Sequence, residues 1–239
     1  MANPDLIVKK SNLLIQKSRF SLSLQEQKLI LFIISKIKPQ DREFQEYSFT
    51  VKEFCELCNI DYTSGKNYGD IKTAIKTLAD KSVWVNIDGA DVLLRWVEKA
   101  KIKDNIISIR IDNDLKPYLL ELNKNFTMYE LFWTLHFKSK YSIRLYELIK
   151  SIHFDNSKPY TRIFKFEELR DLLGAENYDY SNFKLRVLDV AVKEVSDLSD
   201  EYVEYRVVKR NKRKVEEIEL FIETFPTPKK LLKRYRKLK

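Results

Sequence analysis

The stretch from Tyr160 to Glu223 constrains the fold more than any other part of the chain. Its apolar residues alternate over 160–166, then recur with helical spacing over 167–174 and again over 180–197. Two further alternating segments lie within 202–222 and flank a run of basic residues. Strand, helix, turn, helix and basic hairpin is the element order of a winged helix.

The first half of the chain contains a second copy of this pattern. Residues 49–59 align with residues 164–174 at a constant offset of 115, so that Phe49 falls on Phe164. A chance match of apolar pattern could also align the two segments, but the shared order of flanking helices and strands favours a repeat. Two copies of one unit predict an α+β chain of two tandem winged-helix domains related by internal duplication. The predicted domains are residues 1–127 and 128–239.

The second helix of the C-terminal unit presents a polar stripe. At 3.6 residues per turn, three apolar side chains share one face and are predicted to pack inward: Phe183, Val187 and Val190. Beside them runs a stripe of Asn182, Arg186, Asp189 and Lys193. Arginine and asparagine can form paired hydrogen bonds with guanine and adenine, so this stripe is a candidate base-reading surface. The solvated face of any amphipathic helix has the same pattern, and the helix alone leaves both interpretations open.

The hairpin tip favours the nucleic-acid interpretation. Five of six consecutive residues are cationic: Lys209, Arg210, Lys212, Arg213 and Lys214. The net charge is +9, and residues 201–239 alone contain 13 Lys and Arg against 6 Glu. A positive charge localised in this way favours a polyanionic partner, because Lys and Arg release the counterions of nucleic acid. Charged tips also protect hairpins from aggregation, but five like charges at one tip repel one another.

The matching helix of the first unit gives a weaker signal. Its start and outer face carry Lys66, Asn67, Lys72, Thr73 and Lys76. DNA contact and simple solvation are equally compatible with these residues. Three alternating segments follow and predict strands at 82–87, 92–97 and 105–111. The basic tail at 229–239 is compatible with DNA binding and with disorder.

The chain lacks the motifs of a catalytic or cofactor-dependent protein. Cys55 and Cys58 are its only cysteines, and a structural zinc site needs four ligands, so we expect both thiols to lie in the core. No glycine precedes Gly65 at the spacing of a phosphate-binding loop. His136 and His153 are too far apart in the sequence for the histidine pair of a strand-cleaving enzyme. We therefore expect no enzyme activity, no metal and no cofactor.

The cellular location follows from what the sequence does not contain. The N-terminus lacks the apolar core of a signal peptide, and the strongly apolar run at 29–34 is too short to span a bilayer. Two cysteines three positions apart do not form a disulfide framework. We expect a cytoplasmic protein without a membrane partner.

Four segments together resemble a family of plasmid replication initiators. They are residues 22–30 in the first long helix, and residues 138–149, 166–174 and 183–188 in the second half. In this order and spacing they are similar to the iteron-binding initiators of the RepE, RepA and π type. The resemblance covers nearly the whole chain and implies two winged helices that bind double-stranded DNA at directly repeated sites (iterons) in a plasmid origin. It also implies a homodimer, joined through the first domain, that represses the initiator's own gene, and it implies the host initiator and the replicative helicase as partners.

The predicted DNA-binding residues combine the patterns with this resemblance. The second domain would make the main sequence-specific contacts, through Tyr180, Ser181, Asn182, Lys184, Arg186, Lys193, Lys209, Arg210, Asn211, Lys212, Arg213, Lys214, Lys138 and Lys140. The first domain would provide dimerisation and auxiliary contacts through Lys66, Asn67, Lys72 and Lys76. Two alternatives remain open: a tandem winged-helix transcriptional repressor without a role in replication, and a winged-helix module that binds protein instead of DNA.

Overall fold

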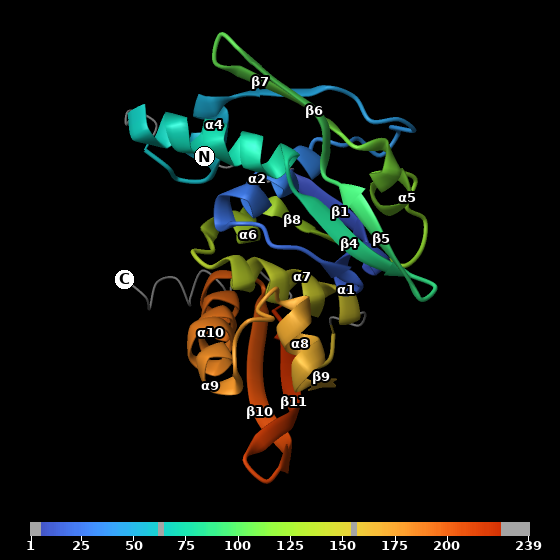
Figure 1. The fold of residues 1–239 in the computed structure, drawn as a ribbon, viewed down its shortest axis with the longest axis vertical. Coiled ribbons are helices and arrows are strands. Elements are labelled where there is room, and N and C mark those ends of the chain that lie inside the picture. The colour runs from blue at the N-terminus through green and yellow to red at the C-terminus, as the bar shows by residue number, and fades with distance from the viewer. Residues whose placement is uncertain (1–5, 62–64, 154–156, 226–239) are drawn as a thin grey trace. The chain divides into compact units, whose positions relative to one another are not determined.

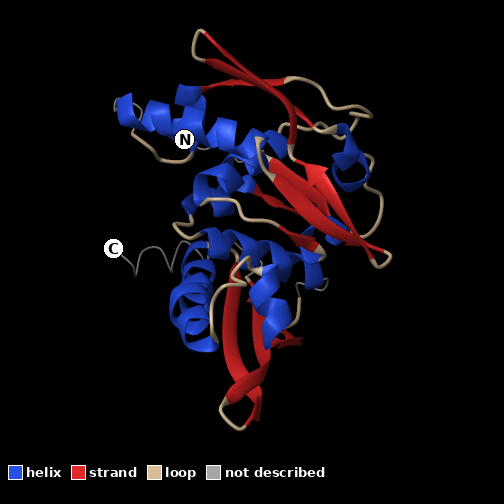
Figure 2. Cartoon of the chain, viewed as in Figure 1, coloured by secondary structure: helices blue, strands red, loops and turns tan. Residues whose placement is uncertain are grey.

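The chain forms two compact units, Met1–His136 and Phe137–Lys239. The structure is a computed structural model that describes residues 6–61, 65–153 and 157–225, with the backbone alone for 65–68. Helices and strands are mixed in both units (Figure 2). The division lies nine residues beyond the predicted boundary at 127/128. The reason is that residues 126–136, read from the sequence as a bridging segment, form a strand and a helix of the first unit.

The core of the first unit is the helix α2 (Leu24–Ile34). Every side chain from Leu29 to Ile34 is buried, so other elements cover the helix on all sides. Its N-terminus is closed by a capping box: the Glu26 backbone N–H donates to Ser23 Oγ at 3.3 Å, and the Ser23 backbone N–H donates to Glu26 Oε2 at 2.6 Å. The Ser–x–x–Glu spacing in the sequence predicts this arrangement.

The Glu26 carboxylate also links α2 to the helix α4 (Gly65–Ala79). Thr77 Oγ1 donates to Glu26 Oε1 at 2.6 Å, and Lys81 Nζ donates to Oε2 at 2.6 Å. Burial alone would raise the pKa of Glu26, but the hydrogen bonds from Lys81, Thr77 and the Ser23 backbone together lower it. The charged form of this buried carboxylate is therefore part of the folded first unit.

Three small antiparallel sheets complete the first unit. Their strand orders are β1-β8, β2-β4-β5 and β3-β7-β6. The strands are β1 (Ile7–Ser11), β2 (Ser18–Arg19), β3 (Tyr47–Thr50), β4 (Ser82–Ile87), β5 (Ala90–Arg95), β6 (Val97–Lys103), β7 (Ile106–Ile111) and β8 (Phe126–Glu130). The remaining helices are α1 (Asn12–Gln16), α3 (Val51–Leu57), η1 (Asn113–Leu115), α5 (Lys116–Leu119) and α6 (Leu131–His136).

The hairpins after α4 correct the sequence prediction. The sequence predicts three strands there, and the structure has four, because the chain bends at the buried Trp96 and continues as β6. Most side chains of β6 are exposed, so this strand lacks the apolar alternation by which a strand is recognised. The predicted turn at Asp88–Gly89 is confirmed between β4 and β5, and both residues have positive φ, at 50° and 88°.

The second unit is a winged helix, as predicted. Its sheet has the order β10-β11-β9, and Figure 1 shows α7 across one end of the sheet and the hairpin tip beyond the other end. Ile218, Leu220 and Ile222 of β11 are buried and form the inner face of the sheet. The elements are α7 (Lys140–Ile152), β9 (Tyr160–Lys165), α8 (Phe166–Leu172), α9 (Tyr180–Phe183), a π-helical turn (Lys184–Leu188), α10 (Asp189–Leu198), β10 (Glu201–Asn211) and β11 (Lys214–Thr224).

The internal duplication is visible in matching elements of the two units. Adding 115 to the bounds of α3 gives the bounds of α8. The same offset relates the residues that end these helices in the left-handed conformation, Asn59 (φ 53°) and Gly174 (φ 70°). In each unit the strand before the short helix pairs with the second strand of a hairpin, β3 with β7 and β9 with β11. The structure thus places two copies of one winged-helix unit in the chain.

Candidate nucleic-acid interface

The recognition helix of the second unit is the continuous helical segment 180–198. Asp179 caps its start, because Asp179 Oδ1 accepts the Asn182 backbone N–H at 2.8 Å and the Asn182 side-chain amide at 3.1 Å. The Asn182 side chain is half-buried and already engaged in this cap. The cap uses one of the two side-chain N–H groups of Asn182 and restrains the orientation of the amide.

A π-helical turn at Lys184–Leu188 interrupts the recognition helix. The buried residues on both sides of this turn are four apart, at Phe183, Val187, Ala191 and Val195. In an uninterrupted α-helix with 3.6 residues per turn, a row of residues four apart gradually leaves the buried face. The wider π-turn takes up the extra residue and keeps the row on that face. Val190, predicted to pack inward, is instead 37% exposed. The register set by the π-turn is the physical reason for this correction.

Asp189, in the middle of the helix, is held by two side chains. Lys184 Nζ donates to Asp189 Oδ2 at 2.8 Å, and the hydroxyl of Tyr205, on β10, donates to Oδ1. Burial would raise the pKa of Asp189, but the hydrogen bonds from Lys184 and Tyr205 lower it. Burial and the hydrogen bond to Asp189 raise the pKa of Tyr205 to about 12. The negative charge of Asp189 is thus balanced within the protein. The same ion pair restrains Lys184, one of the predicted base-reading residues.

Arg186 is the predicted base-reading residue that remains most accessible. Its side chain is exposed and forms no ion pair with any residue that the structure describes. Lys193, farther along the helix, is bound to Asp197 at 2.6 Å across one helical turn. Ser181 is exposed at the start of the helix. The outer face therefore centres on Arg186 and its neighbours, not on the whole predicted stripe.

The wing, β10–β11 with its turn at Lys212–Arg213, carries two kinds of cation. Lys209 is paired with Glu216 at 3.1 Å and Glu217 at 3.6 Å. Lys212, Arg213 and Lys214 are exposed, and none of them forms an ion pair with another described residue. Asn211 is exposed opposite Lys214 in the register of the hairpin. Three cations at the tip thus have no ionic partner among the residues that the structure describes.

Arg210 joins the wing to the recognition helix. Its guanidinium carbon lies 5.7 Å from the centre of the Tyr180 ring, at the first turn of the helix, which is within the range of a cation–π contact. The register of β10 against β11 shifts on both sides of Lys209, and such bulges change the direction of a strand. Helix and wing therefore form one continuous surface within the second unit.

The two predicted lysines at the start of α7 lie beside the recognition helix. Glu194 of α10 accepts the backbone N–H groups of Lys138 at 3.1 Å and Ser139 at 3.0 Å. The Lys138 side chain is exposed. Lys140 Nζ lies 5.0 Å above the Tyr141 ring. Lys138 is therefore well placed to extend the cationic surface, whereas Lys140 is partly engaged by the aromatic ring.

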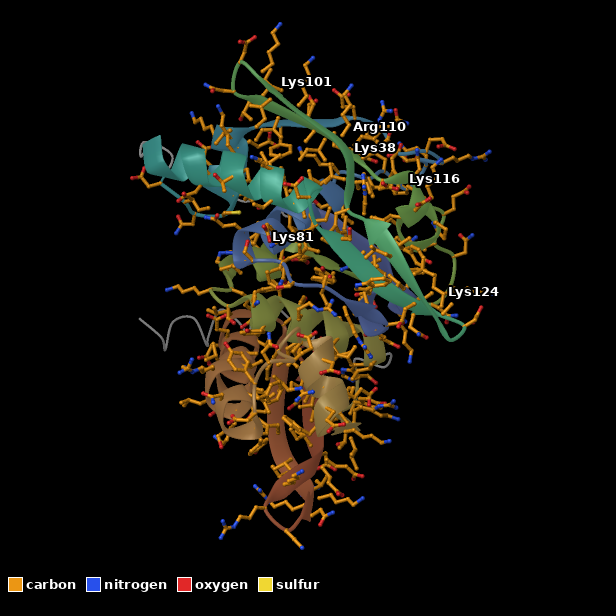
Figure 3. All side chains as sticks on the ribbon, viewed as in Figure 1. Lys38, Lys81, Lys101, Arg110, Lys116 and Lys124 are labelled. Carbon is orange, nitrogen blue, oxygen red and sulfur yellow. The ribbon has the colours of Figure 1, made fainter. Side chains whose placement is uncertain are left out.

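The first unit has a less concentrated set of cations. Lys72 and Lys76 are exposed one turn apart on α4, whereas the side chains of Lys66 and Asn67 lie outside the described residues. The hairpin β6–β7 occupies the position of the wing in the sheet. Its first strand exposes Lys99, Lys101 and Lys103, which the sequence prediction missed although their alternation places them on one face. Figure 3 shows the labelled Lys101 near the end of this hairpin, with Lys38 and Lys116 elsewhere on the unit.

The two cysteines, Cys55 and Cys58, are buried in the core of the first unit. Burial raises the pKa of the Cys55 thiol and raises that of Cys58 to about 12. Among the described residues, no group of three or more His, Cys, Asp and Glu side chains is arranged to hold a metal ion. No helix in the described part of the chain is long and apolar enough to cross a membrane.

Two family models match the two halves of this architecture. Residues 7–150 match the model described as "Initiator Replication protein, WH1". Residues 165–222 match the model described as "Initiator Rep protein, WH2". The chain belongs to this family of replication initiators. The resemblance on which the sequence prediction relied, and the two winged helices that it implied, are therefore confirmed.

Individual relatives of this initiator agree with the family assignment. A replication initiation protein of Escherichia coli is 27% identical over 212 residues, which cover 85% of this chain and 65% of the relative. The chain thus spans just under two thirds of the length of that relative. The crystal structure of the Pi initiator protein in complex with iteron DNA has the same fold, with a TM-score of 0.78 at 19% identity over 95% of this chain and 100% of that one.

Proposed function

We propose that this initiator starts the replication of a plasmid by binding directly repeated sites in the double-stranded DNA of the origin. The observation that carries the proposal is the continuous surface of the second unit, where a recognition helix with Arg186 is joined to a wing with three cations at its tip, and none of these four residues forms an ion pair within the described part of the chain. Membership of the initiator family and the fold shared with an initiator crystallised on iteron DNA support it.

The proposed mechanism is physical and involves no bond-breaking step by this chain. The recognition helix enters a major groove, where Arg186 can bind a guanine edge through two hydrogen bonds. The wing binds the neighbouring phosphates through Lys212, Arg213 and Lys214, which fixes the orientation of the helix in the groove. Several copies bound side by side would bend the origin and strain flexible A·T-rich steps nearby. The host initiator and the replicative helicase would then be recruited to the opened DNA in the cytoplasm.

The first unit would supply auxiliary contacts to the backbone of the same DNA. Lys72 and Lys76 on α4, and the exposed lysines of the β6–β7 hairpin, are suited to phosphate contacts because they are point charges without a fixed plane. Such contacts add affinity without reading sequence. Lys66 and Asn67 belong to the same proposal on the ground of their sequence positions.

We further propose that two copies associate through the first unit to form a homodimer that represses the initiator's own gene. Trp84 of β4 and Leu93 of β5 are cross-strand partners on an exposed face, and they are 49% and 52% exposed. β5 is also an edge strand of its sheet, and an edge strand with adjacent apolar side chains can be covered by a second copy. Trp84→Glu is expected to shift the chain to the monomer in sedimentation velocity runs. An unchanged dimer fraction would place the interface elsewhere.

The test of the proposed function uses the repeats that flank the gene. Full-length protein is expected to bind a duplex carrying one repeat at least tenfold more tightly than a scrambled duplex of the same composition, at physiological salt, since specific complexes exceed non-specific ones by more than about 1,000-fold in typical cases. Equal binding to both duplexes would refute specific recognition. Loss of the plasmid on inactivation of the gene then separates an initiator from a repressor without a replication role.

A further inference from the structure

An exposed apolar strip lies on the recognition helix and is not explained by the fold. The strip consists of Leu185, 66% exposed, and Val190, 37% exposed. Their neighbours Val187 and Leu188 are fully buried, so the helix has enough apolar surface on its inner face to pack against the sheet. Leu185 therefore contributes little to the folded core, whereas Val190 is covered over more than half of its surface.

The π-turn reduces the angle between the two residues of the strip around the helix axis. Residues five apart in an α-helix point in different directions, about 140° apart around the axis. Across a π-turn, residues five apart become neighbours. The structure demonstrates this at the adjacent row, where Lys184 and Asp189 form a 2.8 Å ion pair. By the same geometry, Leu185 and Val190, each one residue farther along, are expected to lie in the adjacent row.

The surroundings of the strip suit a DNA groove better than a protein partner. Exposed Lys184, Arg186 and Lys193 flank it on the same helix. A hydrophobic protein interface is depleted of charge at its centre, whereas a major groove offers an isolated apolar group between two phosphate backbones. That group is the 5-methyl of thymine, which aliphatic side chains contact in direct readout.

We propose that Leu185, supported by Val190, reads a thymine methyl group in the major groove and is a specificity-determining residue of this initiator. The inference rests on the proposed binding to repeated double-stranded DNA and deepens it. Arg186 would define a guanine through hydrogen bonds, and the strip would define a nearby thymine through apolar contact. Because uracil pairs as thymine does and lacks only the methyl group, the two contributions can be separated experimentally.

The experiment is a double-mutant cycle between protein and DNA. The ligand is the repeat duplex, or the duplex that full-length protein selects from a random pool, with each thymine replaced in turn by deoxyuridine. The proteins are the wild type, Leu185→Ala and Val190→Ala, and the control Val208→Ala changes an exposed apolar residue on β10. Circular dichroism melts verify that the variants are folded, which we expect because Leu185 is exposed.

At one or two thymine positions, wild type is expected to lose about fourfold in affinity on the uracil duplex, the effect of one methyl group removed from an apolar contact. Leu185→Ala should bind the thymine duplex about as weakly as wild type binds the uracil duplex, and it should no longer distinguish the two. Val208→Ala should keep the full difference. A thymine preference that survives in Leu185→Ala, or equal losses on both duplexes, would overturn the inference. Equal binding of wild type to repeat and scrambled duplexes would instead overturn the proposed function.

Discussion

Removing the unpaired cations of the wing should change the salt dependence of DNA binding, not only its strength. The variant replaces three residues together: Lys212→Asn, Arg213→Gln and Lys214→Gln. Asparagine is chosen at the first position because Lys212 has φ 53°, and asparagine tolerates the left-handed conformation better than most residues. The turn should therefore persist while its charge is removed.

The expected magnitude follows from the pairing seen in the structure. Each cation that neutralises a phosphate contributes about 0.9 to the slope of log affinity against log salt, so loss of three contacts lowers the slope by about 2.7. Between about 50 mM and about 200 mM salt, the advantage of wild type over the variant should shrink by about 40-fold. Because phosphate contacts carry no sequence information, repeat and scrambled duplexes should lose affinity to a similar extent.

Fluorescence anisotropy titrations across this salt range measure the effect, and Lys209→Gln is the matched control. It changes the net charge of the same hairpin by one unit, but Lys209 is already paired with Glu216 and Glu217. Its slope should therefore stay close to that of wild type. A triple variant with an unchanged slope, or a Lys209→Gln slope lowered by as much as one phosphate contact, would refute the assignment of the free cations.

Three further predictions concern the recognition helix and the core. Arg186→Ala should relax discrimination at one base pair by about 1–3 kcal/mol, measured as the ratio of affinities for duplexes that differ at that pair. Glu26→Gln should lower the free energy of unfolding by about 2 kcal/mol at neutral pH, because a buried carboxylate loses charge-assisted hydrogen bonds. The pKa of Glu26 is lowered on folding. The difference in the free energy of unfolding between wild type and Glu26→Gln should therefore be complete above about pH 5 and should shrink as the pH falls through the folded pKa. Urea titrations at several pH values measure this difference. Cys55 and Cys58 should resist a thiol reagent at pH 8 until the protein unfolds, since burial raises both thiol pKa values; rapid labelling of native protein would contradict their burial.

The fold of the second unit was predictable because each of its elements is specified by residues that are close together in the sequence. Apolar alternation defines β9, β10 and β11, helical spacing defines α7 and α8, and each signal lies within a dozen residues. The duplication was predictable for the same reason, since Phe49 and Phe164 begin equivalent strand-to-helix transitions. Even the left-handed residue that ends each short helix, Asn59 or Gly174, follows the same offset.

The parts that escaped prediction depend on non-local pairing or on exposure. β1 pairs with β8 across more than a hundred residues, Ile7 opposite Glu130, and no local pattern in either segment specifies the other. β6 lies on the surface with charged side chains, so its strand character comes from hydrogen bonds to β7, not from burial. The division between the two units lies beyond the predicted boundary because β8, which pairs with β1, belongs to the first unit.

The π-turn explains why the site was harder to predict than the fold. A helical wheel assumes a constant 3.6 residues per turn and places Val190 inside, whereas one wider turn rotates everything after Leu188 relative to everything before Lys184. Without the wider turn, Phe183 and Ala191, which are eight residues apart, would lie about 80° apart around the axis of a regular α-helix, and the π-turn brings both to the buried face. The core therefore fixes the π-turn, and the π-turn fixes which side chains face outward. In this helix, the packing of the inner face therefore selects the residues that we propose to contact DNA.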